Sequence, residues 1–161
     1  MYSATDKKIV WGNGRCIDFS KAPLVMGIIN VTPDSFFPGS RKAQMETAVR
    51  AAKEMEAAGA DILDIGGEST RPGSDYVDET REIQRIVPVI REIREDSSIL
   101  LSVDTRKAIV AREALDAGAD MINDISALRD DPQLAEIAAQ RDVPIILMHI
   151  RGTPKNMQKN P

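Results

Sequence analysis

Five short apolar runs recur along the chain at a spacing of about 30 residues, and this recurrence restricts the possible folds more than any other feature. The runs show little alternation of apolar and polar side chains, which is typical of strands buried on both faces of a parallel sheet. Stretches with apolar residues at helical spacing separate them, so we expect strand and helix to alternate. The runs cover residues 24–29, 61–65, 99–103, 121–125 and 144–148.

The expected helices carry signals at their ends and on their outer faces. Gly59 and Gly118 each follow an alanine-rich helix and precede a strand, a place where glycine in left-handed conformation commonly ends a helix. A repeat of about 30 residues fits both a (β/α)8 TIM barrel and a doubly wound open sheet, so the period leaves both folds open. The charged residues of the second helix are expected on a solvated face, among them Arg91, Glu92, Arg94 and Glu95.

Polar residues favour one of these two folds. They stand directly after the carboxyl ends of the predicted strands, which is where TIM-barrel enzymes carry their catalytic groups. We therefore predict the α/β class and a (β/α)8 TIM barrel, of which this chain contains about the first five βα units. The residues are Asn30, Gly66, Gly67, Glu68, Asp104, Asn123, Asp124 and His149.

A β-hairpin is predicted ahead of the barrel, because Asn13 and Gly14 form a strong turn signal between two short apolar strands. We expect a single domain over residues 1–161, with the leading hairpin at 8–19 and a partial barrel at 24–161. Five βα units cannot close an eightfold barrel, so we expect the domain to be truncated at its carboxyl end.

Composition excludes several classes of protein. The chain has 21 basic and 25 acidic residues, a net charge of −4 and no block of five basic residues, which argues against a nucleic-acid partner. No apolar stretch approaches the roughly 18 residues that cross a bilayer, so no membrane partner is expected. The single cysteine, Cys16, can form neither an internal disulfide nor a thiolate zinc site, and it favours a cytoplasmic location. A small-molecule ligand is the remaining expectation.

Two loops after predicted strands could bind a ligand. Residues 30–41 combine an amide, a carboxylate, hydroxyls and two phenyl rings, so they form either an ordinary connection or a cover over a planar ligand. Residues 66–74 combine paired glycines with hydroxyls and a guanidinium, which suits either a turn or an anion site. The second loop matches neither the Walker nor the GxGxxG nucleotide motif.

Asp104 and Asn123 end neighbouring predicted strands and have complementary chemistry. A carboxylate accepts paired N–H donors and an amide both donates and accepts, so together they could bind the edge of an aminopyrimidine ring. The alternative is that Asp104, with Thr105, caps the next helix, and the pattern alone favours this cap. His149 is the only histidine, so a catalytic triad or a two-histidine metal site is not expected.

Taken together, the loops resemble those of the dihydropteroate synthase family. Five motifs agree in order and spacing, and the likeness extends from Leu24 to the end of the chain, with the leading hairpin also fitting the family. The motifs are MGIINVTPDSF (26–36), DIGGESTRPG (64–73), SVDT (102–105), INDI (122–125) and LMH (147–149).

The resemblance implies a TIM-barrel transferase of folate biosynthesis. Enzymes of this kind join a dihydropterin methyl diphosphate to p-aminobenzoate and release pyrophosphate, with Mg²⁺ as the cofactor. The resemblance also implies that the intact protein is a homodimer. Withdrawal of the diphosphate needs positive charge at the leaving group, and closing loops keep water away from a reactive pterin cation.

The resemblance further assigns roles to residues at matching motif positions. Asn30 would bind Mg²⁺ and the diphosphate, and Thr70 would contact the diphosphate of the pterin substrate. Asp104 and Asn123 would line the pterin pocket, with Met148 packed near the pterin. Residues that would cover the site and form the p-aminobenzoate pocket are Asp34, Ser35, Phe36 and Arg71. The expected catalytic residues are Asn30, Asp34 and Arg71.

The chain departs from the family pattern in two ways. The family usually continues the first loop with a polar residue and Asp-Gly, whereas residues 37–41 here read FPGSR. The family's second pterin-binding aspartate, its Ser-x-Lys motif and its Arg-x-His clamp come after the fifth strand and are not in this chain, so we expect these 161 residues alone to be inactive. The alternatives are a pterin-binding methyltetrahydrofolate methyltransferase domain, or a non-catalytic fragment or binding module.

Overall fold

The five apolar runs form one parallel sheet in the computed structural model of the chain, which describes residues 8–12, 14–20, 23–32, 41–69 and 76–149. The strands lie side by side in chain order. Because this order never reverses, the described sheet has no switch point of the doubly wound kind, and the winding is that of a (β/α)8 barrel. The strands are β3 (Met26–Asn30), β4 (Ile62–Gly66), β5 (Leu100–Asp104), β6 (Met121–Asp124) and β7 (Ile145–Leu147).

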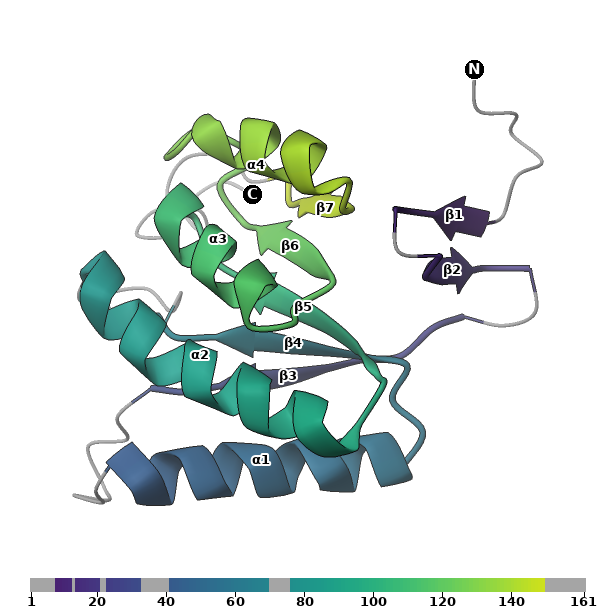
Figure 1. Cartoon of the computed structure of the whole chain (residues 1–161), viewed down its shortest axis with the longest axis vertical. Helices are drawn as coiled ribbons and strands as arrows, with labels where there is room; N and C mark the ends of the chain where they lie inside the picture. Colours follow the sequence, from purple (N-terminus) through teal and green to yellow (C-terminus); the bar gives the residue numbers. More distant parts are fainter. Residues whose placement is uncertain (1–7, 13, 21–22, 33–40, 70–75, 150–161) are drawn as a thin grey trace, which may run out of the picture.

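Helices connect successive strands and pack on the same outer face of the sheet (Figure 1). They are α1 (Arg41–Ala57), α2 (Glu79–Asp96), α3 (Ala108–Asp116) and α4 (Gln133–Arg141). Leu63 and Ile65 of β4 share one core with Ile86 and Ile90 of α2, and all four side chains are fully buried. The predicted alternation of strand and helix is therefore confirmed. Among the helices of the described ranges, none is both long enough and apolar enough to cross a bilayer.

The predicted hairpin is present at the amino ends of the parallel strands. Figure 1 shows it at the side opposite to the edge toward which the arrows of β3 to β6 point. Trp11 packs there against Ile62 of β4 and Met121 of β6 in a second, smaller core. The hairpin thus covers the amino end of the sheet. Its strands, β1 (Lys8–Val10) and β2 (Cys16–Asp18), pair antiparallel.

Glycines end two of the helices, as the sequence predicts. Gly59 follows α1 with a φ of 98°, and Gly118 follows α3 with a φ of 113°. This left-handed region suits glycine because it carries no Cβ atom. In the hairpin turn, Gly14 also has a positive φ of 78°, whereas Asn13 lies outside the described residues.

The prediction that Arg94 lies on a solvated helix face is wrong. Arg94 donates hydrogen bonds to the Gly118 carbonyl oxygen at 2.9 Å and to Asp120 Oδ2 at 2.7 Å. Asp120 Oδ2 also accepts the Leu101 backbone N–H at 2.9 Å, so this buried carboxylate joins α2 to the amino ends of β5 and β6. Glu82 of the same helix is also buried, contrary to the prediction, whereas Arg91, Glu92 and Glu95 are exposed as predicted.

Candidate functional site

Three of the predicted site residues lie in one row across the carboxyl ends of the strands. In the sheet register, Asn30 of β3 pairs with Gly66 of β4. Gly66 pairs in turn with Asp104 of β5, and Asp104 pairs with Asn123 of β6. Successive side chains of a strand point to opposite faces, and Ile65 beside this row is buried in the core under the helices. The row therefore faces the side of the sheet that the helices do not cover.

Two oxygen atoms converge on the space above Gly66. A Cβ atom on this glycine would lie 3.3 Å from Asp104 Oδ2 and 3.5 Å from Asn30 Oδ1. Glycine therefore avoids crowding the two oxygens, because an added Cβ atom would make a tight contact with Asp104. Asn30 is exposed and Asp104 is partly exposed, so a ligand can reach both. A carboxylate beside an amide oxygen suits N–H donors or a hard cation.

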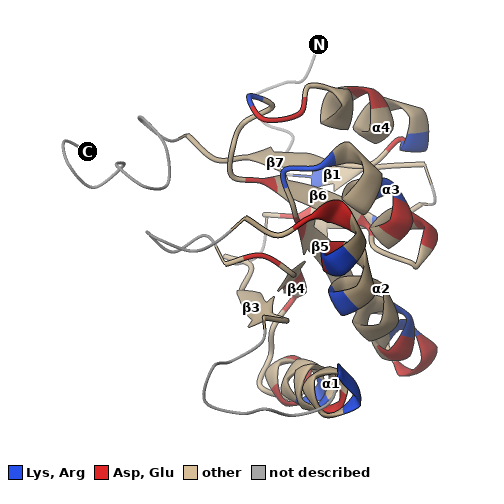
Figure 2. Cartoon of the chain, turned by 90° about the vertical axis from the view of Figure 1, so that its left-hand side faces the viewer, with Lys and Arg blue, Asp and Glu red and all other residues tan. Residues whose placement is uncertain are grey.

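Acidic side chains shape the electrostatics of this face. Burial and the nearby charges of Asp64 and Glu82 raise the pKa of Asp104 from 3.8 to about 7, while the charge of Arg106 opposes the rise. Burial likewise raises the pKa of Asp64. Figure 2 shows acidic residues in red within the strands as well as along the helices. At neutral pH Asp104 is therefore close to half ionised. The ionised form can accept hydrogen bonds from the N–H groups of a ligand.

The interpretation of Asp104 as a helix cap is wrong. Helix α3 starts at Ala108, and Lys107 at its N-cap position makes no capping bond with its side chain. The Ala108 backbone N–H instead donates to Asp131 Oδ2 at 2.7 Å. Thr105 Oγ1 accepts the Lys107 backbone N–H at 3.3 Å. Asp104 thus does not serve the helix, and its carboxyl group is directed to the row.

A group of buried ion pairs beside the row was not predicted from the sequence. Lys107 Nζ lies 2.5 Å from Glu68 Oε2 and 2.5 Å from Glu82 Oε2, and it sits 4.6 Å from the centre of the Tyr76 ring. Arg106 Nη2 pairs with the other oxygen of Glu68 at 2.7 Å. These contacts tie the chain after β4 to the start of α2 and to the residues after β5. The two adjacent cations after Asp104 were the available signal in the sequence.

The remaining predicted site residues fall into two groups. Met148 and His149 follow β7 and are exposed, and the Met148 backbone N–H donates to the Asp124 carbonyl oxygen at 3.1 Å. Met148 therefore lies at the same end of the sheet as the row. The other group lies outside the described residues and stays a set of predictions: Asp34, Ser35, Phe36, Thr70 and Arg71.

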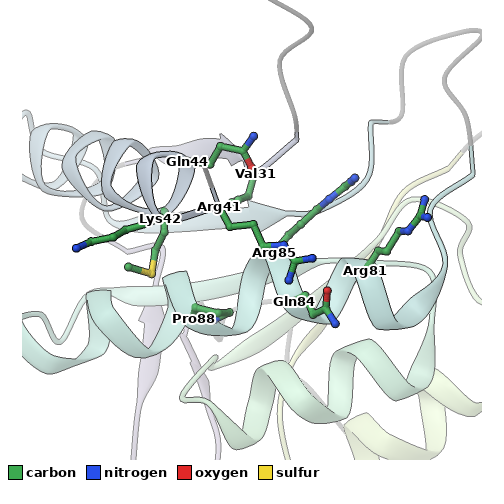
Figure 3. Close-up of a pocket in the computed structure, with 9 residues that line it drawn as sticks. Val31, Arg41, Lys42, Gln44, Arg81, Gln84, Arg85 and Pro88 are labelled. Atoms are coloured by element: carbon green, nitrogen blue, oxygen red, sulfur yellow. The ribbon is translucent and has the colours of Figure 1, made fainter. Parts of the chain in front are cut away.

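Two cavities lie near the row. One of about 510 Å³ includes Asn30, Val31 and Thr32 and continues along α1, so it adjoins the site directly. The other, of about 690 Å³, lies between the beginnings of α1 and α2 (Figure 3) and has a basic lining of Arg41, Lys42, Arg81 and Arg85. Among the described residues, none of the row lines this second cavity, so we place the candidate site on the inner face of the sheet.

Known proteins match the chain over most of its length. A family model described as pterin binding enzyme matches residues 26–161. The dihydropteroate synthase of Synechocystis is 50% identical over 141 residues, which are 88% of this chain and 49% of that protein. The dihydropteroate synthase of Bacillus subtilis is 50% identical over 135 residues, which are 84% of this chain and 47% of that protein. The chain thus spans about half the length of these relatives.

Solved structures agree with the sequence relatives. The dihydropteroate synthase of Yersinia pestis, in complex with a sulfonamide drug, superposes with a TM-score of 0.83 and 46% identity, covering 96% of this chain and 55% of that one. The dihydropteroate synthase of Xanthomonas albilineans with 4-aminobenzoic acid superposes with a TM-score of 0.78 and 46% identity, covering 86% of this chain and 51% of that one. The strand order, the row at the carboxyl edge and these matches lead to one conclusion. The chain belongs to the pterin-binding enzyme family.

Proposed function

We propose that the protein carrying this chain is a dihydropteroate synthase. It is a transferase that condenses a dihydropterin methyl diphosphate with p-aminobenzoate to give dihydropteroate and pyrophosphate. The observation that carries this proposal is the row of Asn30, Asp104 and Asn123 across the carboxyl ends of the strands, in which Asn30 Oδ1 and Asp104 Oδ2 converge at Gly66. The 50% identity to dihydropteroate synthases over most of the chain supports it.

In this proposal the row binds the pterin ring. The ionised Asp104 carboxyl group accepts two N–H donors from the aminopyrimidine edge, and the Asn123 amide binds a neighbouring position of the ring. Met148, which follows the adjacent strand β7, packs against the ring face. The hairpin covers the amino end of the strands, so the diphosphate group would extend outward toward the loops at the carboxyl end.

Asn30 would hold Mg²⁺ together with the substrate's diphosphate. Its Oδ1 atom faces the space above Gly66, and oxygen ligands suit Mg²⁺. No group of three or more His, Cys, Asp or Glu side chains in the described ranges is arranged for a metal, which fits an ion that takes further ligands from substrate phosphates and water. The bound ion would supply positive charge to the departing pyrophosphate. Thr70 would add a hydroxyl contact to the same group.

The loops after β3 and β4 would bind p-aminobenzoate. Asp34, Ser35 and Phe36 belong to the first loop and Arg71 to the second, and the guanidinium is suited to the carboxylate of p-aminobenzoate. Asn30, Asp34 and Arg71 are the proposed catalytic residues. The two loops would exclude water while the arylamine attacks the pterin methylene carbon.

The proposal extends to the assembly and location of the protein. We place residues 1–161 in one pterin-binding barrel domain, with the hairpin at 8–19 as part of it. The intact protein is proposed to be a homodimer in the cytoplasm. The absence of a second cysteine from this sequence supports a reducing compartment.

Product analysis tests the proposed reaction. The full-length protein is incubated with dihydropterin methyl diphosphate, p-aminobenzoate and Mg²⁺, and dihydropteroate and pyrophosphate are measured by mass spectrometry. We expect both products in equal amounts, and none without p-aminobenzoate. Methyl transfer from methyltetrahydrofolate to cobalamin, with no dihydropteroate formed, would instead assign the protein to the methyltransferase branch.

Two neighbouring glycines provide a matched pair of variants for the proposed site. Gly66→Ala places a methyl group between Asn30 and Asp104, so we expect pterin affinity to fall about tenfold or more with little loss of stability. Gly67→Ala directs its methyl group to the other face, 2.9 Å from Glu82 Cγ and Ile86 Cγ2. It should cost about 1–3 kcal/mol of stability and leave affinity unchanged. Calorimetric binding and urea unfolding measure both, and equal effects of the two variants on affinity would contradict the assignment.

A further inference from the structure

A polar layer lies on the inner face of the sheet just below the row of site residues. Asp64 of β4 lies two residues before Gly66 and so points to the same face, where it is only 3% exposed. Asp64 Oδ2 accepts a hydrogen bond from Asn123 Nδ2 at 2.8 Å. The two strands that carry these residues are separated by β5, whose Ser102 pairs with Asp64 in the register. A small residue at this point allows the hydrogen bond to cross over β5.

The chemistry of the two groups fixes the orientation of the amide. An ionised carboxyl group only accepts hydrogen bonds, so it selects the NH₂ end of Asn123. The Oδ1 atom of Asn123 shares one carbon with Nδ2 and points to the other side. The end of the amide left for a ligand is therefore the acceptor end.

Maintaining Asp64 in this position has an energetic cost. Burial raises the pKa of the Asp64 carboxyl group, because it penalises the ionised form, and hydrogen bonds from Ser102 and Asn123 offset this effect only in part. The desolvation of a buried carboxyl group destabilises the fold, and an apolar residue would avoid this cost. A residue that lowers the stability of the fold and lies beside a ligand site is typically retained for function.

We propose that Asp64 is a positioning residue that holds the Asn123 amide with its oxygen toward the ligand, so that this position accepts only a ring N–H donor. The identity of the ligand as a pterin rests on the proposed function. The hydrogen bond then determines which rings bind. A ring that has a lone pair at this position, in place of an N–H group, cannot donate a hydrogen bond to the Asn123 oxygen. Asp64 acts through Asn123 and touches no substrate.

Exchanging the two side chains tests the proposal in the full-length protein. In Asn123→Asp alone, two carboxyl groups face each other, and we expect affinity to fall about tenfold or more at pH 8. In Asp64→Asn with Asn123→Asp, the new amide donates to the new carboxylate, whose second oxygen again accepts from the ligand. This double variant should bind within about threefold of the unchanged protein. Asp64→Asn alone should weaken binding about two- to fivefold, because only part of the population presents the oxygen.

The exchange distinguishes an acceptor from a donor at position 123. If the Asn123 nitrogen met the ligand instead, a carboxylate could not replace it, and the double variant would bind as weakly as Asn123→Asp. That result would overturn the proposal. The probe is a dihydropterin with a hydroxymethyl group in place of the diphosphate ester, measured by isothermal titration calorimetry. In turnover, we expect the KM for the pterin to follow the same pattern while the KM for p-aminobenzoate stays constant.

A ligand-free measurement separates this inference from the proposed function. The urea midpoint should fall in Asn123→Asp and recover in the double variant, because the hydrogen bond is restored. The exposed Asp96 provides a control, since Asp96→Asn should change neither pterin affinity nor its pH dependence. If the protein binds no pterin, the proposed function is refuted. The urea midpoints of the variants would still test whether Asp64 fixes the orientation of the Asn123 amide. Failure of the midpoint to recover would refute the positioning role of Asp64.

Discussion

We expect the Lys107→Met substitution to lower the free energy of unfolding by about 3–5 kcal/mol. Lys107 Nζ pairs with Glu68 and Glu82, whose side chains are 10% and 1% exposed. Burial alone would lower the pKa of Lys107, but the hydrogen bonds and charges of Glu68 and Glu82 raise it above the usual value, so the ammonium stays charged. Methionine fills a similar volume and leaves two buried carboxyl groups without this cation. The loss therefore comes from Glu82, which loses its Lys107 partner, and from Glu68, which keeps only Arg106, rather than from a cavity.

The exposed pair of Lys53 and Asp96 provides the control for this prediction. Lys53 Nζ lies 2.8 Å from Asp96 Oδ2, but the two side chains are 56% and 67% exposed. Solvent and salt screen such a pair, so Lys53→Met should change stability by less than about 1 kcal/mol. Urea unfolding of both variants at neutral pH measures the difference. Losses of similar size would show that burial does not govern the strength of these ion pairs.

The fold could be predicted from the sequence because its signals are local. The apolar runs, the helical spacing and the glycines at helix ends each depend on neighbouring residues, and β3 to β7 lie where those patterns predict them. Arg94 was misassigned because its partner Asp120 lies 26 residues away and on another element. A charged residue on a helix gives the same local pattern whether it meets water or a buried carboxylate.

The site was predicted in part for the same reason. An aspartate shortly before a helix is a genuine cap signal, but α3 takes its hydrogen bond from Asp131, which lies 23 residues from Ala108. Sequence motifs could indicate Asp104 and Asn123, whereas the convergence at Gly66 depends on the sheet register. Asp64 gave a weaker signal. Asp64 is a polar residue within an apolar run, and it lies on the same face of the strand as Gly66. Only the structure shows its hydrogen bond to Asn123.

The second large effect concerns Asp104, and we expect Asp104→Asn to stabilise the protein above pH 7. In the unfolded chain this carboxyl group has a pKa of about 3.9. In the folded protein the pKa is raised to about 7, first by burial and then by the charge of Asp64. Between these two values the folded state binds more protons than the unfolded state, so stability falls as pH rises. Asparagine carries no charge and removes this loss.

The size and pH dependence of the effect make the prediction specific. The difference in stability between Asp104→Asn and the unchanged protein should grow from pH 4 to pH 7 by up to about 4 kcal/mol and then level off. Asp96→Asn should show the opposite sign and only below about pH 4, because Lys53 lowers the pKa of Asp96 beneath its unfolded value. Urea unfolding at several pH values measures both, and a difference that does not vary with pH would contradict the raised pKa of Asp104.

The ionisation of Asp104 should also govern pterin binding, but with the opposite pH dependence: affinity rises with pH where stability falls. With a pKa of about 7, the ionised share of Asp104 rises about tenfold from pH 6 to pH 8, so pterin affinity should rise by a similar factor. Asp104→Asn should bind pterin far more weakly at every pH and show no such rise, since an amide cannot accept both N–H donors. We therefore expect Asp104→Asn to give a more stable protein that binds pterin poorly. This combination is expected when a buried charge is retained for binding, because burying that charge destabilises the fold.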